Sequence, residues 1–113
     1  MELLVCVINK SELLDEILAG MLEAGISGCT VIDSQGMGKI ISQDIPIFSG
    51  FKSLFSGARE SNFTIFSVVK EEEVMNEAIT VIKKIYGEFD EPNAGILFTI
   101  PVSRVEGLTS AKS

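Results

Sequence analysis

The residues best suited to bind an anion are two glycines and a lysine within a run of four positions. The run Gly36-Met37-Gly38-Lys39 follows directly on a β-branched, apolar stretch. Glycines at a strand end let backbone amides approach a phosphate, and a lysine there would neutralise charge. Two such glycines are also typical of a plain turn or bulge. If an anion binds, we expect Lys39 and Arg104 to be its cationic contacts.

The residue types that carry catalysis are scarce. The chain has no histidine, no Gly-x-Ser-x-Gly elbow and no Walker-type glycine loop. An acid–base pair would have to come from four acidic residues, which are Asp33, Asp44, Glu88 and Asp90. Without histidine a soft metal site also lacks a common ligand. We therefore expect no enzyme, no catalytic residue and no metal site.

The two cysteines, Cys6 and Cys29, each lie in an apolar, strand-like run. A small buried hydrophobe is the commonest role of cysteine in that setting. We expect both to be buried and neither to form a disulfide.

The charge and length of the chain exclude several classes of protein. A net charge of -7 with nine Lys and Arg argues against nucleic acid as a partner, which would require a clustered basic face. The 113 residues allow one domain, 1–113. The first apolar run is too short to cross a bilayer and lacks a basic leader, so we expect a cytoplasmic protein without membrane insertion.

Hydrophobic periodicity predicts four strands and two helices. The strands are expected at 3–8, 29–34, 63–69 and 95–100, and the helices at 12–24 and 70–86. Ser11 is the expected N-cap of the first helix, and Gly25 and Gly87 the expected stops. Pro101 ends the last strand or places it at an edge. The first helix presents an apolar stripe of Leu14, Ile17, Leu18, Met21 and Leu22, and the second one of Val74, Ala78, Val81, Ile82 and Ile85.

The order β-α-β, long loop, β-α-β predicts an α+β, ferredoxin-like βαββαβ fold. In this fold a four-stranded antiparallel sheet carries two helices on one face. The first and fourth strands are apolar at nearly every position. In a sheet with one solvent-exposed face, apolar and polar residues should alternate along each strand. We therefore expect the second face to be covered by further copies of the chain.

The segment 40–62 has no sustained period, and we expect a long flexible loop with a function. Its apolar residues have two interpretations: a short amphipathic turn packed on the assembly itself, or a docking surface for a partner such as a membrane protein. These residues are Phe48, Phe51, Leu54 and Phe55. The last residues, 109–113, are expected to form a disordered tail.

Three motifs resemble the PII nitrogen-regulatory proteins and their PII-like relatives. The run Gly25-Ile26-Ser27-Gly28-Cys29-Thr30-Val31 is similar to the family's Gly-Ile-x-Gly-x-Thr-Val. Gly36-Met37-Gly38-Lys39 follows at the distance of the family's Gly-x-Gly-Arg/Lys, and Ser103-Arg104-Val105 resembles its Ala-Arg-Val. With the element order and the long loop, the resemblance covers nearly the whole chain.

The resemblance implies a homotrimer with three clefts between subunits, each of which binds an adenine nucleotide such as ATP, ADP or AMP, or another small metabolite. It implies that the loop 40–62 corresponds to the family's T-loop, which docks on a transporter, an enzyme or a transcription regulator. Gly36, Gly38 and Lys39 would lie at the base of that loop beside the nucleotide. Gly87 and Gly95 would bracket the family's second ligand loop.

Some positions depart from the family pattern. Ile40 stands where classical members carry a glutamine that serves magnesium and 2-oxoglutarate, so we do not expect 2-oxoglutarate sensing. The segment 88–93 is acidic where the family is basic and glycine-rich. The long loop has no tyrosine for uridylylation. The resemblance is therefore to a divergent, PII-like protein.

Three alternatives remain open. One is a CutA-like trimer of the same general fold, associated with divalent cations, which would have a shorter, strand-like connector and ligating side chains. Another is a PII-like trimer that binds no nucleotide and acts through protein contact alone. The third, an enzyme in the cleft between subunits, would require a convergent acid–base pair.

Overall fold

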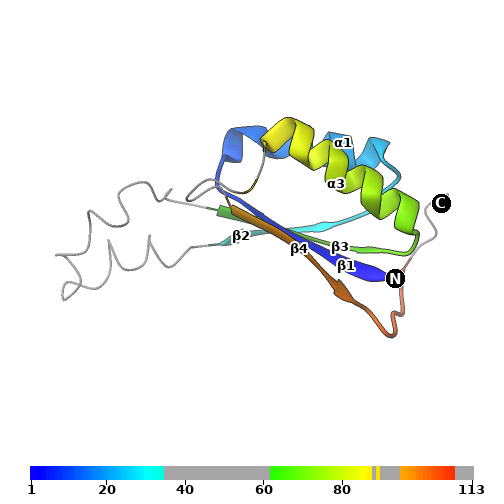
Figure 1. Ribbon diagram of the computed structural model, residues 1–113. Coiled ribbons are helices and arrows are strands. Elements are labelled where there is room, and N and C mark those ends of the chain that lie inside the picture. The colour runs from blue at the N-terminus through cyan, green and yellow to red at the C-terminus, as the bar shows by residue number, and fades with distance from the viewer. Residues whose placement is uncertain (35–61, 88, 90–94, 109–113) are drawn as a thin grey trace, which may run out of the picture.

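The computed structural model describes residues 1–34, 62–87, 89 and 95–108. Four strands form one antiparallel sheet in the order β2-β3-β1-β4, and the two helices lie together on one of its faces (Figure 1). The strands are β1 (Glu2–Ile8), β2 (Thr30–Ser34), β3 (Asn62–Val69) and β4 (Gly95–Pro101), and the helices are α1 (Leu14–Glu23), preceded by the 3-10 turn η1 (Ser11–Leu13), and α3 (Glu72–Tyr86). This arrangement confirms the predicted α+β, ferredoxin-like fold.

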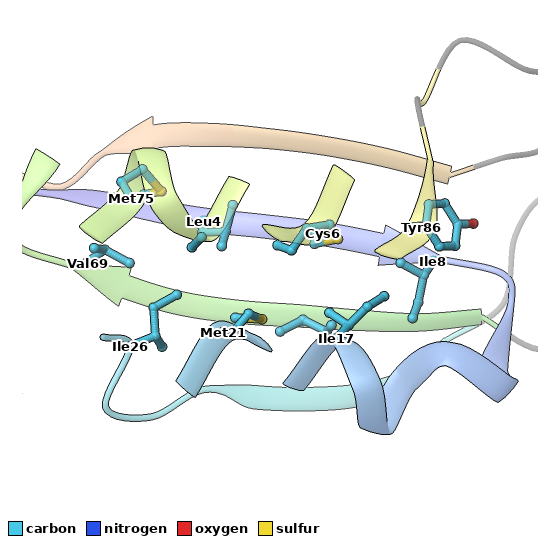
Figure 2. Packing of buried hydrophobic residues seen from close by; sticks show 12 residues of the cluster. Leu4, Cys6, Ile8, Ile17, Met21, Ile26, Val69, Met75 and Tyr86 are labelled. Carbon is cyan, nitrogen blue, oxygen red and sulfur yellow. The ribbon is translucent and has the colours of Figure 1, made fainter. Parts of the chain in front are cut away.

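The register of the sheet decides which residues enter the core. Cys6 of β1 pairs with Ile65 on one side and Leu97 on the other, so these three side chains share the face that the helices cover. The helices contribute Ile17, Met21, Met75, Ala78, Ile82 and Tyr86 to the same cluster (Figure 2). A two-layer core of this kind buries the apolar stripe of each helix against one side of the sheet.

The helix stripes differ from the prediction at one position in α1 and two in α3. Leu22 of α1 was expected in the apolar stripe, but 66% of it is exposed. Met75 and Tyr86, which we did not assign to the stripe of α3, are 3% and 4% exposed. Leu22 lies outside the arc of α1 that carries the buried residues Ile17, Gly20 and Met21.

The helix ends follow the glycines and not the predicted cap. Gly25 and Gly87 adopt φ of 112° and 98°, the left-handed region in which glycine terminates helices without steric cost. Ser11 is not an N-cap; it is the first residue of η1, which follows Lys10, and no side chain caps η1 or α1. Acidic Glu72 and Glu73 in the first turn of α3 and basic Lys83 and Lys84 in its last turn match the helix dipole.

The sheet face opposite the helices is apolar. β1 places Leu3, Val5 and Val7 there, and the register puts Phe66 and Phe98 on either side of Val5. No helix or strand within the described residues covers this open sheet face. Its exposed large hydrophobic residues are Ile32, Ile96, Phe98 and Ile100, at 47%, 54%, 40% and 44%.

The two ends of the sheet carry different parts of the chain. We call one end the loop end, because β1 ends there at Ile8, β2 ends at Ser34, and β3 and β4 begin at Asn62 and Gly95. The opposite end, where Glu2 pairs with Val69 and with Pro101, is the terminal end. Figure 1 shows the N-terminus at the terminal end. Pro101, the last residue of β4, lies on an edge strand as predicted.

Candidate functional site

The loop end brings together the two predicted ligand-loop glycines. Gly95 begins β4 and pairs with Ile8, the last residue of β1. Gly87 follows Tyr86 directly, and the Tyr86 hydroxyl reaches the residue after Ile8. The two glycines therefore flank the end of β1 although they are eight positions apart in the sequence.

Gly95 is the more constrained of the two glycines. Its φ of 115° lies in the left-handed region, and a Cβ there would collide with the Val7 carbonyl oxygen and lie 3.3 Å from the Tyr86 hydroxyl. A Cβ on Gly87, whose φ is 98°, would meet nothing within 4 Å. Close backbone approach is thus the reason for glycine at 95, whereas backbone conformation alone is the reason at 87.

Tyr86 and Asn9 form a reciprocal pair of hydrogen bonds at this end. The Asn9 backbone N–H donates to the Tyr86 hydroxyl oxygen at 3.1 Å, and the Tyr86 hydroxyl donates to Asn9 Oδ1 at 2.7 Å. Tyr86 is 4% exposed, and its ring lies beside Ile8 in the core (Figure 2). The pair joins the last turn of α3 to the residue after β1, across 77 positions of sequence.

Two further side chains contact the Tyr86 ring. Lys10 Nζ lies 5.0 Å from the ring centroid, within the range of a cation–π interaction. The Phe89 ring stacks on Tyr86 with 5.1 Å between centroids and 27° between planes. The buried Tyr86 ring therefore contacts a cation and a second aromatic ring beside Gly87 and Gly95.

Hydroxyl groups join the last residue of β2 to the start of β3. The Ser34 hydroxyl lies 2.9 Å from the Thr64 hydroxyl oxygen and donates to the Asn62 carbonyl at 3.3 Å. Ser34 and Asn62 are paired in the sheet. These contacts join β2 to β3 at the loop end, where β2 ends and β3 begins.

Arg104 lies at the opposite end of the molecule. It follows Pro101, which pairs with Glu2 at the terminal end, and its side chain is exposed. Gly95 is the first residue of β4, and the length of this strand, about 20 Å at roughly 3.3 Å per residue, separates it from the segment that carries Arg104. Within one subunit, the fold does not bring Arg104 to the predicted ligand-loop glycines.

The remaining predicted site residues lie outside the described residues. These are Gly36, Met37, Gly38 and Lys39 of the anion-binding run, and Phe48, Phe51, Leu54 and Phe55 of the long loop. Within 1–34, 62–87, 89 and 95–108, no cluster of three or more histidine, cysteine, aspartate or glutamate side chains is placed to hold a metal ion.

The cysteines differ from each other. Cys6 is fully buried, as predicted, and burial raises the pKa of its thiol to about 12. Cys29 was expected to be buried but is exposed, because β2 begins one residue later, at the sheet edge. Partial burial raises the pKa of its thiol as well.

Sequence reasoning missed Asn9, Lys10 and Tyr86 as members of this site, and it placed Phe89 in the second ligand loop without giving it a contact. In the sequence, Asn9 and Lys10 indicated only the end of the first strand, and Tyr86 only the last turn of the second helix. One signal was available, since Tyr86 is the single tyrosine of the chain and directly precedes a helix-ending glycine. Its hydrogen-bond partner is too distant in sequence to be identified from that signal.

Comparison with protein families gives one match along almost the entire chain. The model described as nitrogen regulatory protein P-II matches residues 1–112. The chain belongs to the PII family. PII proteins are nitrogen regulatory signalling proteins, typically trimeric, and are regulators, not enzymes. No curated protein matches the chain.

The candidate ligand-loop glycines lie at the end of the sheet where β2 ends and β3 begins, because Gly95 begins β4 at that end and Gly87 follows Tyr86 there. None of the helices in the described part of the chain is long and apolar enough to cross a membrane.

Proposed function

We propose that this PII protein is a cytoplasmic, homotrimeric regulator that binds a small effector in clefts between subunits. The effector class that we propose is an adenine nucleotide, ATP, ADP or AMP. The bound effector would change how the loop 40–62 contacts a membrane transporter or a metabolic enzyme. The aromatic residues of that loop, Phe48, Phe51 and Phe55, with Leu54, would supply the contact surface.

The observation that carries the proposal is the separation of the candidate ligand residues. Gly87 and Gly95 lie at the loop end, whereas Arg104 lies about one strand length away at the terminal end. A site that uses all three therefore has to combine the loop end of one subunit with the segment after β4 of its neighbour. Lys39, with Gly36, Met37 and Gly38, would complete the loop-end half.

The open sheet face supports the homotrimer. Ile96, Phe98 and Ile100 of β4 alternate onto this face and are each at least 40% exposed. Contiguous exposed apolar surface of this kind is typical of protein interfaces. Burying it between subunits would also bring segments of neighbouring chains together.

A second candidate is a PII trimer without nucleotide binding that acts through protein contact alone. The segment 88–94 favours it, because it contains Glu88, Asp90 and Glu91 and no lysine or arginine. Carboxylates there would repel phosphates. A CutA-like, cation-associated protein receives no such support, since the described residues offer no metal cluster.

The first experiment is calorimetric titration with ATP, ADP and AMP, each with and without magnesium, after the oligomeric mass has been measured. We expect micromolar binding that is lost in Lys39→Ala and in Arg104→Ala. Lys70→Ala is the matched control, because Lys70 is an exposed cation that follows β3 at the same end of the sheet as Arg104. Absence of binding to all three nucleotides would reject the nucleotide effector and favour the second candidate.

Mixing the two defective variants tests whether the site is shared. If Lys39 and Arg104 act from different subunits, refolded mixtures of Lys39→Ala and Arg104→Ala chains contain intact sites at roughly a quarter of their interfaces. Nucleotide binding should then return to that fraction. A mixture that stays inactive would show that both residues belong to one subunit's site or that neither binds directly.

A further inference from the structure

The hydroxyl of Tyr86 makes specific hydrogen bonds in addition to occupying volume in the core. The chain has one tyrosine and seven phenylalanines, and a phenylalanine at 86 would supply nearly the same buried volume. The Tyr86 hydroxyl instead both accepts from the Asn9 N–H and donates to Asn9 Oδ1. A buried hydroxyl with two such partners specifies the relative placement of the elements that it joins.

Those elements are the three that meet around the connection from Gly87 to Gly95. Tyr86 is the last residue of α3, Asn9 follows β1, and Gly95 begins β4. A Cβ on Gly95 would lie 3.3 Å from the Tyr86 hydroxyl, so β4 starts directly against this group. The same ring stacks on Phe89, which lies inside the connection.

We propose that Tyr86 is a positioning residue, which fixes the two ends of the Gly87–Gly95 connection against the end of β1. This inference rests on the proposed function, in which the two glycines bracket an effector loop. Fixing Gly87 and Gly95 before binding lowers the conformational entropy that these two residues lose on effector binding. Tyr86 thereby sets the effector affinity without contacting the effector.

Lys10 lies on the same ring and so belongs to the positioned group. Its ammonium lies 5.0 Å from the Tyr86 ring centroid. Tyr86→Phe keeps the ring, and therefore separates the hydroxyl's role from that of the cation–π contact. Asn9→Ala removes the side-chain partner of the hydroxyl and keeps Tyr86 itself.

The test is amide hydrogen exchange by NMR on the full-length assembly, for the wild-type protein, Tyr86→Phe and Asn9→Ala. The amides of Gly87, Phe89 and Gly95 report on the connection. Val69→Ala is the matched control, since Val69 is also buried, at 5%, but lies on β3 at the terminal end. It loses stability by truncation of a core side chain without touching the Tyr86 group.

In Tyr86→Phe and in Asn9→Ala, we expect exchange at Phe89 and Gly95 to rise at least roughly fivefold, the effect of losing one buried hydrogen bond. Exchange at these two amides should stay within about twofold of wild type in Val69→Ala. Tyr86 emission should also change in Asn9→Ala, because the chain has no tryptophan and no other tyrosine. Unchanged exchange in Tyr86→Phe, or an equal rise in Val69→Ala, would overturn the proposal.

Nucleotide titration of the same variants separates this inference from the proposed function. If the wild-type protein binds ATP, ADP or AMP, Tyr86→Phe should bind it at least roughly fivefold more weakly, and Val69→Ala should match wild type. Equal affinity in Tyr86→Phe and wild type would overturn the link to the effector. If wild type binds none of them, the nucleotide proposal fails, and the exchange data still decide whether Tyr86 positions the connection.

Discussion

At the scale of single residues, Gly95 occupies the tightest backbone position of the candidate site. Its left-handed φ, the Val7 carbonyl oxygen and the Tyr86 hydroxyl together leave no room for a Cβ. The resemblance to PII pointed to this glycine as one bracket of a ligand loop. The physical reason for it, close approach to β1, appears only in the structure.

Gly95→Ala should therefore be more damaging than Gly87→Ala. We expect the second change to cost about 1–2 kcal/mol for its positive φ alone. Gly95→Ala should cost about 2–4 kcal/mol, because displacement of the Val7 backbone adds to the same φ penalty. Urea unfolding of the two variants measures the difference, and equal losses would contradict the close approach.

Cys6 makes the stability of the protein sensitive to alkaline pH. Its folded pKa of about 12 exceeds the unfolded value of 9.0, so the folded state holds the thiol proton more tightly. The resulting stabilisation is complete below pH 9.0 and is lost as the pH rises from there towards about 12. The loss can reach about 1.4 kcal/mol for each pH unit in that window.

Cys6→Ala should remove this pH dependence. We expect the difference in unfolding free energy between wild type and Cys6→Ala to be constant up to about pH 8.5, and to shrink as the pH rises above that. Urea unfolding of both proteins in a reducing buffer at several pH values tests this prediction. The other groups that titrate at alkaline pH are the same in both proteins, so their effects cancel in the difference. A difference that stays constant up to about pH 10.5 would show that Cys6 ionises without penalty.

At the scale of elements, the two helices approach each other through Gly20. A Cβ on Gly20 would overlap Val81 Cγ1 and lie 3.2 Å from Ile85 Cδ1, so α1 and α3 are in closest contact where α1 has no side chain. Val81 is β-branched and therefore stiff within a helix. Neither the glycine nor the valine alone indicates this contact in the sequence.

Gly20→Ala should destabilise the protein even though alanine is the better helix former. Because a Cβ at this position would overlap the stiff Val81 side chain, overpacking should cost about 2–3 kcal/mol, which exceeds the propensity gain of about 1 kcal/mol. Val81→Ala should relieve the overlap, so the double variant should be more stable than the sum of the single changes predicts. Thermal unfolding of the three variants measures this coupling, and strict additivity would contradict the close approach.

At the scale of the whole molecule, the open sheet face has to be buried for the assembly that we propose. Phe98 lies midway along the edge strand β4, beside Val5, and Ile96 and Ile100 flank it along the strand. Leu22 is even more exposed, at 66%, but lies on α1 on the other side of the sheet. The two positions are thus a matched pair for locating the subunit interface.

Phe98→Asp should dissociate the trimer, because an unpaired carboxylate would be buried at an apolar interface. Leu22→Asp should leave the trimer intact. Sedimentation velocity at equal protein concentrations gives the mass of each variant. Dissociation by Leu22→Asp but not by Phe98→Asp would place the interface on the helix layer.

The sequence by itself determined the elements and their order, because hydrophobic period and glycine stops act over a few neighbouring residues. It also indicated that the sheet has two apolar faces, since β1 and β4 do not alternate. The tertiary structure decided the rest. The hydrogen bonds between Tyr86 and Asn9 join residues 77 positions apart. The exposure of Cys29 depends on where β2 starts at the sheet edge. The distance of Arg104 from Gly95 depends on the direction of β4. Each of these follows from strand register and helix placement, which arise from contacts between residues far apart in the chain.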